Sequence, residues 1–260
     1  MNLDLIRKDF PILETQVNGH QIVYFDNGAT TQRPLPVVNA VVDYVTHQNG
    51  NPHRGAHIFA ISASEAYDTS KEVVRDFIHA RSEKEIIYTR NTTESLNLVS
   101  RSYGETHLKK GDHILITIAE HHSNLVTWQR AAEKTGAVLD YIYIDKETGH
   151  FPEEELKKID DPRVKILAFA QVSNVLGVEF DPKPLIKRAH AHGAVVVLDG
   201  AQSTPHKQID VQDLDCDFFA FSGHKMCSMG GIGVLYAKEE LLDEMEPFLM
   251  GGDMIETVEE

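Results

Sequence analysis

A lysine that follows a short apolar run is the first candidate for chemistry in this sequence. The run Asp217–Phe221 is too short for a helix and strongly β-prone, and it leads into Ser222-Gly223-His224-Lys225. Ligands of α/β proteins bind at the carboxyl edge of the sheet, where such a lysine would lie. A partly desolvated amine there can lose its proton and react with a carbonyl group. The alternative for Lys225 is an exposed loop position, which is usual for lysine.

Four further motifs follow predicted strands, so their side chains are expected at the same edge of the sheet. They are Arg90-Asn91-Thr92-Thr93-Glu94, Glu120-His121-His122-Ser123-Asn124, Ser173-Asn174-Val175-Leu176-Gly177 and Asp199-Gly200-Ala201-Gln202-Ser203. Each has a purely structural interpretation, such as a helix start with a capping box for Asn91 and Glu94. Each also has a functional one, because a helix start can bind phosphate, an imidazole can stack on a ring and an amide can donate to a ring oxygen.

The carboxylate of Asp199 ends the run Ala194–Leu198, which is apolar throughout and must be interior. A carboxylate in that position needs a partner, which could be a helix N-terminus or a protonated pyridine nitrogen. Taken together, the motifs offer phosphate donors, a ring stacker, a ring-oxygen donor, a pyridinium partner and a lysine. This is the set of groups that pyridoxal phosphate requires. The sequence has no Gly-x-Gly-x-x-Gly, Gly-Lys-Ser/Thr or Gly-x-Ser-x-Gly motif that would indicate another chemistry.

Close histidine pairs raise the alternative of a metal site. The pairs are His53/His57, His121/His122 and His190/His192. None is accompanied by a matching set of Asp, Glu or Cys ligands, so we expect no metal.

Composition limits the class of protein. The chain has 260 residues and a net charge of −15, which argues against binding nucleic acid or anionic membrane surfaces. The longest aliphatic run, Ala194–Leu198, is too short to span a bilayer. Cys216 and Cys227 are the two cysteines and give no disulfide framework, and no apolar signal segment is seen near Met1. We therefore expect a cytoplasmic protein.

Apolar runs alternate with helical patterns over most of the chain. Strands are expected at Gln21–Phe25, Glu85–Thr89, His113–Ile118, Val138–Ile144, Val164–Val172, Ala194–Leu198, Asp217–Phe221 and Gly231–Ala237. Helices are expected at Asp4–Phe10, Pro34–Gln48, Ser62–Ala80, Thr92–Tyr103, Asn124–Thr135, Glu153–Ile159 and Pro182–His192. The predicted fold class is α/β, with a mainly parallel, doubly wound sheet and helices on both faces. The strand after the lysine is expected to be antiparallel, because no crossover helix fits before it.

The sequence resembles the class V aminotransferase group of fold-type-I pyridoxal phosphate enzymes, and within it the Suf-type cysteine desulfurases and their selenocysteine lyase relatives. The resemblance rests on Tyr24-Phe25-Asp26-Asn27-Gly28-Ala29-Thr30-Thr31, Asn51-Pro52-His53-Arg54-Gly55, Thr92-Thr93-Glu94-Ser95-Leu96-Asn97, Glu120-His121-His122-Ser123-Asn124, Ser173-Asn174-Val175-Leu176-Gly177, Asp199-Gly200-Ala201-Gln202 and Phe221-Ser222-Gly223-His224-Lys225. The double histidine followed by Ser-Asn and the Gly-His-Lys turn are its most specific parts.

This resemblance implies roles for individual residues. Lys225 would bind the cofactor covalently and move protons, and His121 would stack on the ring and act as acid or base. Asp199 would pair with the ring nitrogen, whereas Asn174 and Gln202 would contact the ring oxygen. The phosphate would be held by Thr92, Thr93, Ser222 and His224. The implied reaction converts L-cysteine to L-alanine and delivers persulfide sulfur to an acceptor protein for iron–sulfur cluster assembly. The implied assembly is a homodimer with Arg54 and Gly251-Gly252-Asp253-Met254-Ile255 near the interface.

The sequence departs from the family pattern at Gly28, where alanine or serine is usual, and in two further places. Ser228-Met229-Gly230 stands where the family usually has Gly-Pro-Thr, and the chain ends before the region of the family's persulfide-forming cysteine and substrate-binding arginine. The expected organisation is an N-terminal arm over residues 1–25 and a cofactor-binding large domain over 26–260, without the C-terminal small domain. The leading hypothesis is an incomplete cysteine desulfurase. The alternatives are a selenocysteine lyase or another class V lyase or epimerase, and a non-catalytic cofactor-binding remnant.

Overall fold

A seven-stranded sheet with the order β3-β9-β8-β7-β6-β4-β5 forms the centre of the structure, a computed structural model that describes residues 2–252. The strands are β3 (Ile86–Thr89), β4 (His113–Thr117), β5 (Val138–Ile142), β6 (Val164–Ala170), β7 (Val195–Asp199), β8 (Phe218–Ser222) and β9 (Gly233–Ala237). Strands β8, β7, β6, β4 and β5 run parallel, and β9 runs antiparallel to both β3 and β8. The predicted fold class, including the antiparallel strand after the lysine, is confirmed.

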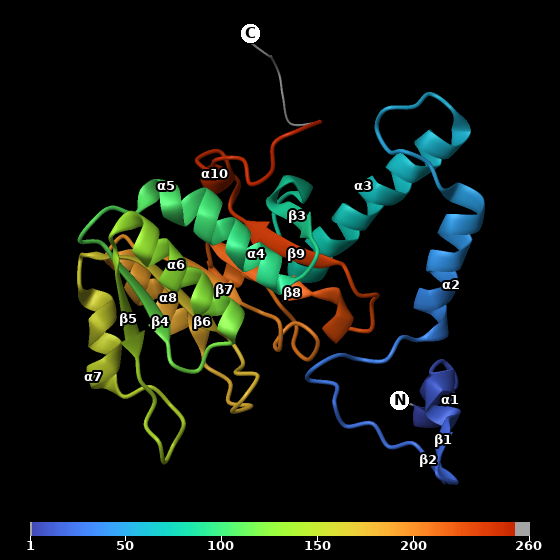
Figure 1. The fold of residues 1–260 in the computed structure, drawn as a ribbon, viewed down its shortest axis with the longest axis horizontal. Helices are drawn as coiled ribbons and strands as arrows, with labels where there is room; N and C mark the ends of the chain where they lie inside the picture. Colours follow the sequence, from blue (N-terminus) through green and yellow to red (C-terminus); the bar gives the residue numbers. More distant parts are fainter. Residues whose placement is uncertain (1, 253–260) are drawn as a thin grey trace.

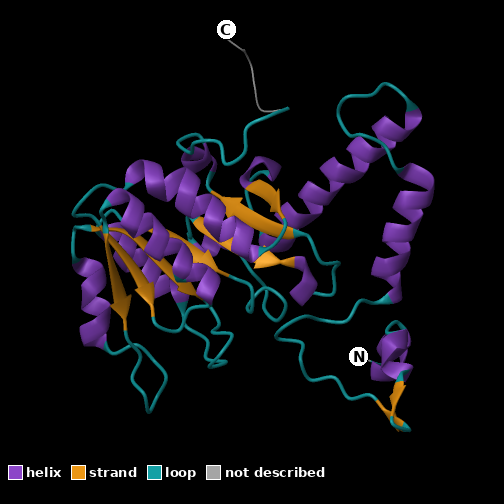
Figure 2. Ribbon diagram, viewed as in Figure 1, coloured by secondary structure: helices purple, strands orange, loops and turns teal. Residues whose placement is uncertain are grey.

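Helices cover both faces of this sheet (Figures 1 and 2). The α-helices are α1 (Leu3–Lys8), α2 (Leu35–Asp43), α3 (Ile58–Ile78), α4 (Thr92–Leu98), α5 (Glu105–His107), α6 (Val126–Thr135), α7 (Glu153–Leu156), α8 (Pro182–Ala191), α9 (Val211–Leu214) and α10 (Glu239–Leu242). Side chains of α4 and α6 pack in the apolar cluster on one face. Side chains of α8, α9 and the end of α3 pack in the cluster on the other face.

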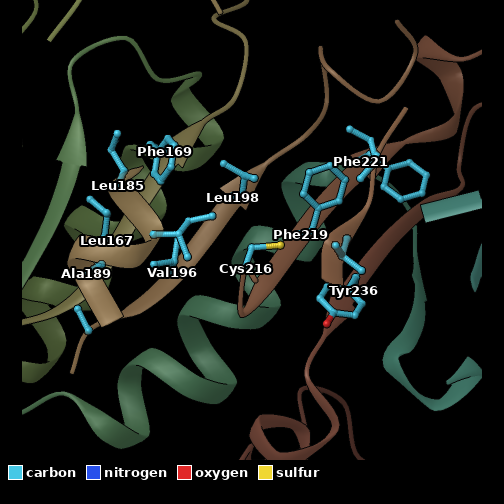
Figure 3. Close-up of a cluster of buried hydrophobic side chains, with 14 of the residues drawn as sticks. Leu167, Phe169, Leu185, Ala189, Val196, Leu198, Cys216, Phe219, Phe221 and Tyr236 are labelled. Carbon is cyan, nitrogen blue, oxygen red and sulfur yellow. The ribbon is translucent and has the colours of Figure 1, made fainter. Parts of the chain in front are cut away.

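Successive residues of the central strands alternate between these two clusters, which explains why the strands are apolar throughout. Val196 and Leu198 of β7 lie in the cluster with α8 and α9, together with Phe219 and Phe221 of β8 (Figure 3). Val197 of β7 lies in the cluster with α4 and α6 on the other face. Such complete burial of a phenylalanine contributes several kcal/mol, since phenylalanine-to-alanine changes in cores cost about 3–5 kcal/mol. The central strands are therefore a rigid support for whatever follows their carboxyl ends.

The predicted strand Gln21–Phe25 is wrong. The structure instead has a two-residue strand pair, β1 (Gln16–Val17) and β2 (His20–Gln21), and residues 22–25 form no strand. Phe25 is 94% exposed, so the apolar run of residues 22–25 does not mark a face packed on a core. The other predicted helices and strands are present with shifts of a few residues at their ends. The segment of α1, β1, β2 and α2 lies beside the sheet-containing body (Figure 1).

Within residues 2–252, the structure contains no helix with the length and apolarity needed to cross a membrane.

A buried ion network ties strands together at the edge opposite the lysine. Asp217, which is 6% exposed, accepts hydrogen bonds from His190 Nε2 at 2.7 Å, from the Val196 N–H at 2.7 Å and from Lys238 Nζ at 2.8 Å. Burial acts to raise the pKa of Asp217, but these hydrogen bonds outweigh burial and the pKa lies below its ordinary value. The hydrogen bond to Asp217 raises the pKa of His190 in turn. The network therefore connects α8, β7, β8 and β9.

We predict that Asp217→Asn lowers the free energy of unfolding by roughly 3 kcal/mol, because it leaves buried donors and a cation without their anion. The lowered Asp217 pKa gives stability that is present above the ordinary value of 3.8 and lost as the pH falls through the folded-state pKa. The raised His190 pKa gives stability that is present below 6.5 and lost as the pH rises through the folded-state pKa. The difference between wild type and variant should therefore peak between these two values.

The measurement is urea unfolding over a range of pH, with the exposed Asp243→Asn as the matched control. A difference of the same size at every pH would contradict the assignment.

Candidate active site

A cavity of about 690 Å³ opens at the carboxyl edge of the sheet. Every site residue that the sequence predicted lines this cavity: Thr92, Thr93, His121, Asn174, Asp199, Gln202, Ser222, His224 and Lys225. They come from the segments that follow β3, β4, β6, β7 and β8. The parallel run of the strands explains the convergence, because it brings loops that are distant in sequence to one edge.

Asp199 is the last residue of β7 and is 4% exposed. Its Oδ1 accepts a hydrogen bond from the Ala201 N–H at 2.9 Å. Burial raises the pKa of Asp199 above its ordinary value, against the opposing influence of Ala201, Lys225 and His121. Gly200 permits this turn, because a Cβ at that position would overlap the Phe219 ring. The cavity thus contains a desolvated carboxylate that is fixed by a backbone hydrogen bond.

Lys225 ends the 3-10 turn η7 (Gly223–Lys225) directly after β8. Burial lowers the pKa of the Lys225 amine, and Asp199 acts in the opposite direction. At a given pH, a larger fraction of this amine is therefore neutral than in an exposed lysine. A carboxylate and an amine that share one partly buried cavity can serve acid–base or covalent chemistry.

His121 precedes the short turn η5 (His122–Asn124) at the mouth of the loop after β4. Its Nδ1 accepts a hydrogen bond from the Ser123 N–H at 3.2 Å and lies 2.7 Å from Ser123 Oγ. This assigns the proton of the neutral ring to Nε2. Burial lowers the pKa of His121, so the neutral form is favoured near neutral pH even though Asp199 acts to raise the pKa.

Hydroxyl groups gather where α4 begins. The Thr92 N–H donates to Ser222 Oγ at 2.7 Å, and the two hydroxyl oxygens are 2.6 Å apart. Asn91 caps α4 as predicted, since its Oδ1 accepts from the Glu94 N–H at 2.9 Å. The reciprocal half of the predicted capping box differs, because Glu94 accepts from the N–H of Arg90 instead. Capping is therefore complete while Thr92 and Thr93 remain at the cavity wall.

Asn174 and Gln202 occupy opposite loops at the cavity. Asn174 is exposed, and its neighbour Ser173 donates through Oγ to the Ala119 carbonyl at 3.0 Å. Gln202 donates through Nε2 to the Gly28 carbonyl at 2.9 Å, which joins it to the N-terminal segment.

Thr30 and Thr31 hold the turn of Lys225, a role that no sequence motif indicated. The His224 carbonyl accepts from Thr30 Oγ1 at 3.0 Å, from Thr31 Oγ1 at 3.1 Å and from the Thr31 N–H at 2.9 Å. Thr31 Oγ1 also accepts from the Cys227 N–H at 2.7 Å. The loop before α2 therefore fastens the turn of Lys225 from the other end of the chain (Figure 1). The sequence shows two adjacent threonines in a polar turn, but this pattern does not indicate that they bind the turn of Lys225.

The two cysteines lie away from the amine. Cys216 is fully buried in the core below β8, and burial raises the pKa of its thiol. Cys227 has a left-handed backbone, with φ of 65°, and lines a separate cavity with Arg7 and Phe10. Closeness in sequence to Lys225 therefore does not bring Cys227 into the same cavity. Among residues 2–252, no group of three or more His, Cys, Asp or Glu side chains could hold a metal ion.

We predict that Thr31→Val loosens the lysine turn, because it leaves the Cys227 N–H without an acceptor at a cost of about 1–2 kcal/mol. Hydrogen exchange of the 223–228 segment should become faster. Thr31→Ser, which keeps the hydroxyl, should exchange like the wild type. Equal exchange in the valine variant would show that the hydroxyl does not hold the turn.

Solved structures with this architecture include cysteine desulfurases. A cysteine desulfurase of Escherichia coli superimposes with a TM-score of 0.88 and 40% identity, covering 100% of this chain and 63% of that one. A cysteine desulfurase of Thermococcus onnurineus gives a TM-score of 0.90 and 42% identity, covering 98% of this chain and 62% of that one. A protein described as SspA in complex with cysteine gives a TM-score of 0.80 and 29% identity over 90% of this chain and 66% of that one.

Curated relatives give the same result. A protein of Halalkalibacterium halodurans named "Probable cysteine desulfurase" is 49% identical over 99% of this chain and 63% of its own length. The "Cysteine desulfurase" of Synechococcus elongatus is 48% identical over 97% of this chain and 40% of its own length. The chain thus spans less than two thirds of these relatives. The sequence profile described as "Aminotransferase class-V" matches residues 23–260, and the chain therefore belongs to the class V aminotransferase family.

Proposed function

We propose that this chain binds pyridoxal 5′-phosphate and forms the cofactor-binding part of a cysteine desulfurase, which converts L-cysteine to L-alanine and passes the sulfur to a thiol. The observation that carries the proposal is the meeting of Lys225, Asp199 and His121 in one cavity at the sheet edge. Relatives named as cysteine desulfurases at 48–49% identity support it.

The residues present fit the cofactor. A cavity of about 690 Å³ is of the size that small-molecule sites have, about 300–1,000 Å³. The buried Asp199 carboxylate is compensated by one backbone N–H at 2.9 Å and gains from a further cationic partner, which a protonated pyridine nitrogen supplies. The hydroxyls of Thr92 and Ser222 lie together at the same cavity, as donors for a phosphate group.

The positions of these residues are compatible with the roles that the family resemblance implies. We assign the ring nitrogen to Asp199, the aldehyde to Lys225 and the ring face to His121. We assign the ring oxygen to Asn174 and Gln202, and the phosphate to Thr92, Thr93, Ser222 and His224. Gln202 Nε2 donates to the Gly28 carbonyl, and His224 Nδ1 lies 3.2 Å from Thr30 Oγ1, so the N-terminal segment holds both of these side chains.

Pyridoxal phosphate, when bound, supplies an electron sink that stabilises negative charge at the α-carbon of an amino acid. The chain's own residues must then handle protons and charge. Lys225 is suited to accept and return a proton, because burial lowers its pKa towards neutrality. His121 is favoured as the neutral ring and can also exchange a proton through Nε2. Asp199 remains a fixed carboxylate because the Ala201 N–H anchors it.

The sulfur-accepting thiol is the group that these residues do not provide. Neither Cys216 nor Cys227 lines the cavity of Lys225 in the described part of the chain. We therefore propose an acceptor thiol from outside residues 2–252, with onward transfer to an acceptor protein for iron–sulfur cluster assembly. A small-molecule thiol can take this place in an assay.

We further propose a cytoplasmic homodimer. Helices α2 and α3 carry exposed apolar side chains, including Val41, Val42, Ile58 and Phe59, and a second copy is the partner that the family resemblance implies. Arg54 lies close to Gly252, where a Cβ would be 3.1 Å from Arg54 Nη2. The expected interface residues Asp253, Met254 and Ile255 lie outside the described residues. The domain division at residues 25 and 26 also remains a prediction.

The test is release of alanine from L-cysteine by the chain with added pyridoxal phosphate and dithiothreitol. We expect the wild type to release alanine and Lys225→Ala to release none. Asp199→Asn should release alanine at least about a hundredfold more slowly than the wild type, because the variant loses a fixed charge at the reacting group. The exposed Lys187→Ala is the matched control.

Binding of pyridoxal phosphate without any alanine would contradict desulfurase activity and favour a non-catalytic cofactor-binding protein. A strong preference for selenocysteine over cysteine would favour a selenocysteine lyase.

A further inference from the structure

The proposed function leaves a buried acid unexplained. Glu120 directly precedes His121 and is buried beneath the cavity, although it does not line it. Its Oε1 accepts hydrogen bonds from the Thr117 hydroxyl and from the Ala170 N–H, the latter at 3.0 Å. Its Oε2 accepts from Asn124 Nδ2 at 2.6 Å. Three donors from β4, β6 and the turn η5 thus converge on one carboxyl group.

We propose that Glu120 and Asn124 are positioning residues that hold the His121 loop over the cavity. This deepens the proposed function and rests on it for the role of His121. The side-chain bond between Glu120 and Asn124 closes the base of the loop, while the backbone bond from the Asn124 N–H to the His121 carbonyl, at 2.8 Å, closes its tip.

The direction of His121 follows from this anchoring. The backbone at His121 is extended, with φ of −67° and ψ of 148°. These are the angles of polyproline II, in which neighbouring side chains point in different directions. Because Glu120 is tied into the core, His121 is turned to the cavity. The Ser123 N–H then fixes the ring by donating to Nδ1.

The orientation of the Asn124 amide is fixed independently. Trp128 is fully buried in α6, and its Nε1–H donates to Asn124 Oδ1 at 2.9 Å. An indole nitrogen can only donate, so the oxygen of the amide must face Trp128 and the NH₂ group must face Glu120. Asn124 is itself 0% exposed, so an unpaired amide there would be costly.

Glutamine cannot replace Glu120 for this reason. An amide nitrogen in the place of Oε2 would face the Asn124 NH₂ group, and one in the place of Oε1 would face the Ala170 N–H. In either orientation, two hydrogen-bond donors face each other without an acceptor. Burial raises the pKa of Glu120 to about 8, whereas its hydrogen bonds act to lower it. Even when it is protonated, a carboxyl oxygen keeps a lone pair that can accept a hydrogen bond, and an amide nitrogen has none.

The experiment is a double-mutant cycle with a built-in rescue. At a pH above the Glu120 pKa of about 8, Glu120→Gln and Asn124→Asp each place like groups together, and the cycle is measured there. The double variant E120Q/N124D restores the pairing, because the new carboxylate accepts from both the new amide and the Trp128 indole, while the oxygen of the new amide accepts from the Ala170 N–H. The net charge of the double variant equals that of the wild type. The exposed Glu133→Gln on α6 is the matched control.

Two quantities are measured for each variant, namely the affinity for pyridoxal phosphate and the ¹⁵N chemical shifts of the His121 ring in cofactor-free protein. We expect Glu120→Gln to weaken cofactor binding about tenfold and to average the ring shifts between tautomers, since a buried donor is left unpaired. The double variant should recover binding to within about threefold and regain the wild-type shifts. Glu133→Gln should change neither quantity.

Wild-type affinity and ring shifts in Glu120→Gln would overturn the proposal, as would a double variant no better than the single one. A lower melting temperature with unchanged His121 shifts would also overturn it, by making the pair merely structural. If the wild-type chain does not bind pyridoxal phosphate, the proposed function fails, and the His121 shifts alone decide the positioning role.

Discussion

The burial of one carboxylate is the constraint on which the site depends. Asp199 ends an aliphatic strand and is 4% exposed, so its desolvation must be compensated. The protein supplies one N–H from Ala201, while Lys225 and His121 favour the ionised form electrostatically. A cationic ligand atom at the cavity completes this compensation. The same burial lowers the pKa of Lys225, so one desolvated environment prepares both an anion for a ring nitrogen and an amine for a carbonyl.

This arrangement requires that the loops around the cavity be held without filling it. Polar groups below and outside the cavity meet that requirement. Thr31, in the N-terminal segment, accepts a hydrogen bond from the turn of Lys225. The hydrogen-bonded pair Glu120–Asn124 holds the loop of His121 from the core. The cavity side of each loop remains available to a ligand, and the sheet beneath provides the rigid reference.

The fold and the residues that line the cavity could be predicted from the sequence, because both depend on patterns of neighbouring residues. An apolar run such as Val195–Leu198 marks a strand buried on both faces, and polar residues after parallel strands must meet at one edge. The strand predicted at Gln21–Phe25 failed because its apolar side chains do not pack on a core, with Val23 and Phe25 both largely exposed. The bond between Thr31 and His224 joins residues 193 positions apart, and a partner at that separation leaves no local signal.

The central claim is that Lys225 and Asp199 hold pyridoxal phosphate in this cavity. Its most direct test is to add the cofactor, reduce with borohydride, and map the modified peptide by mass spectrometry. The account predicts a single stoichiometric label on Lys225 and much weaker labelling when Asp199 is changed to alanine. Labelling spread over surface lysines in proportion to their exposure, or equal labelling of Lys225 without Asp199, would contradict it.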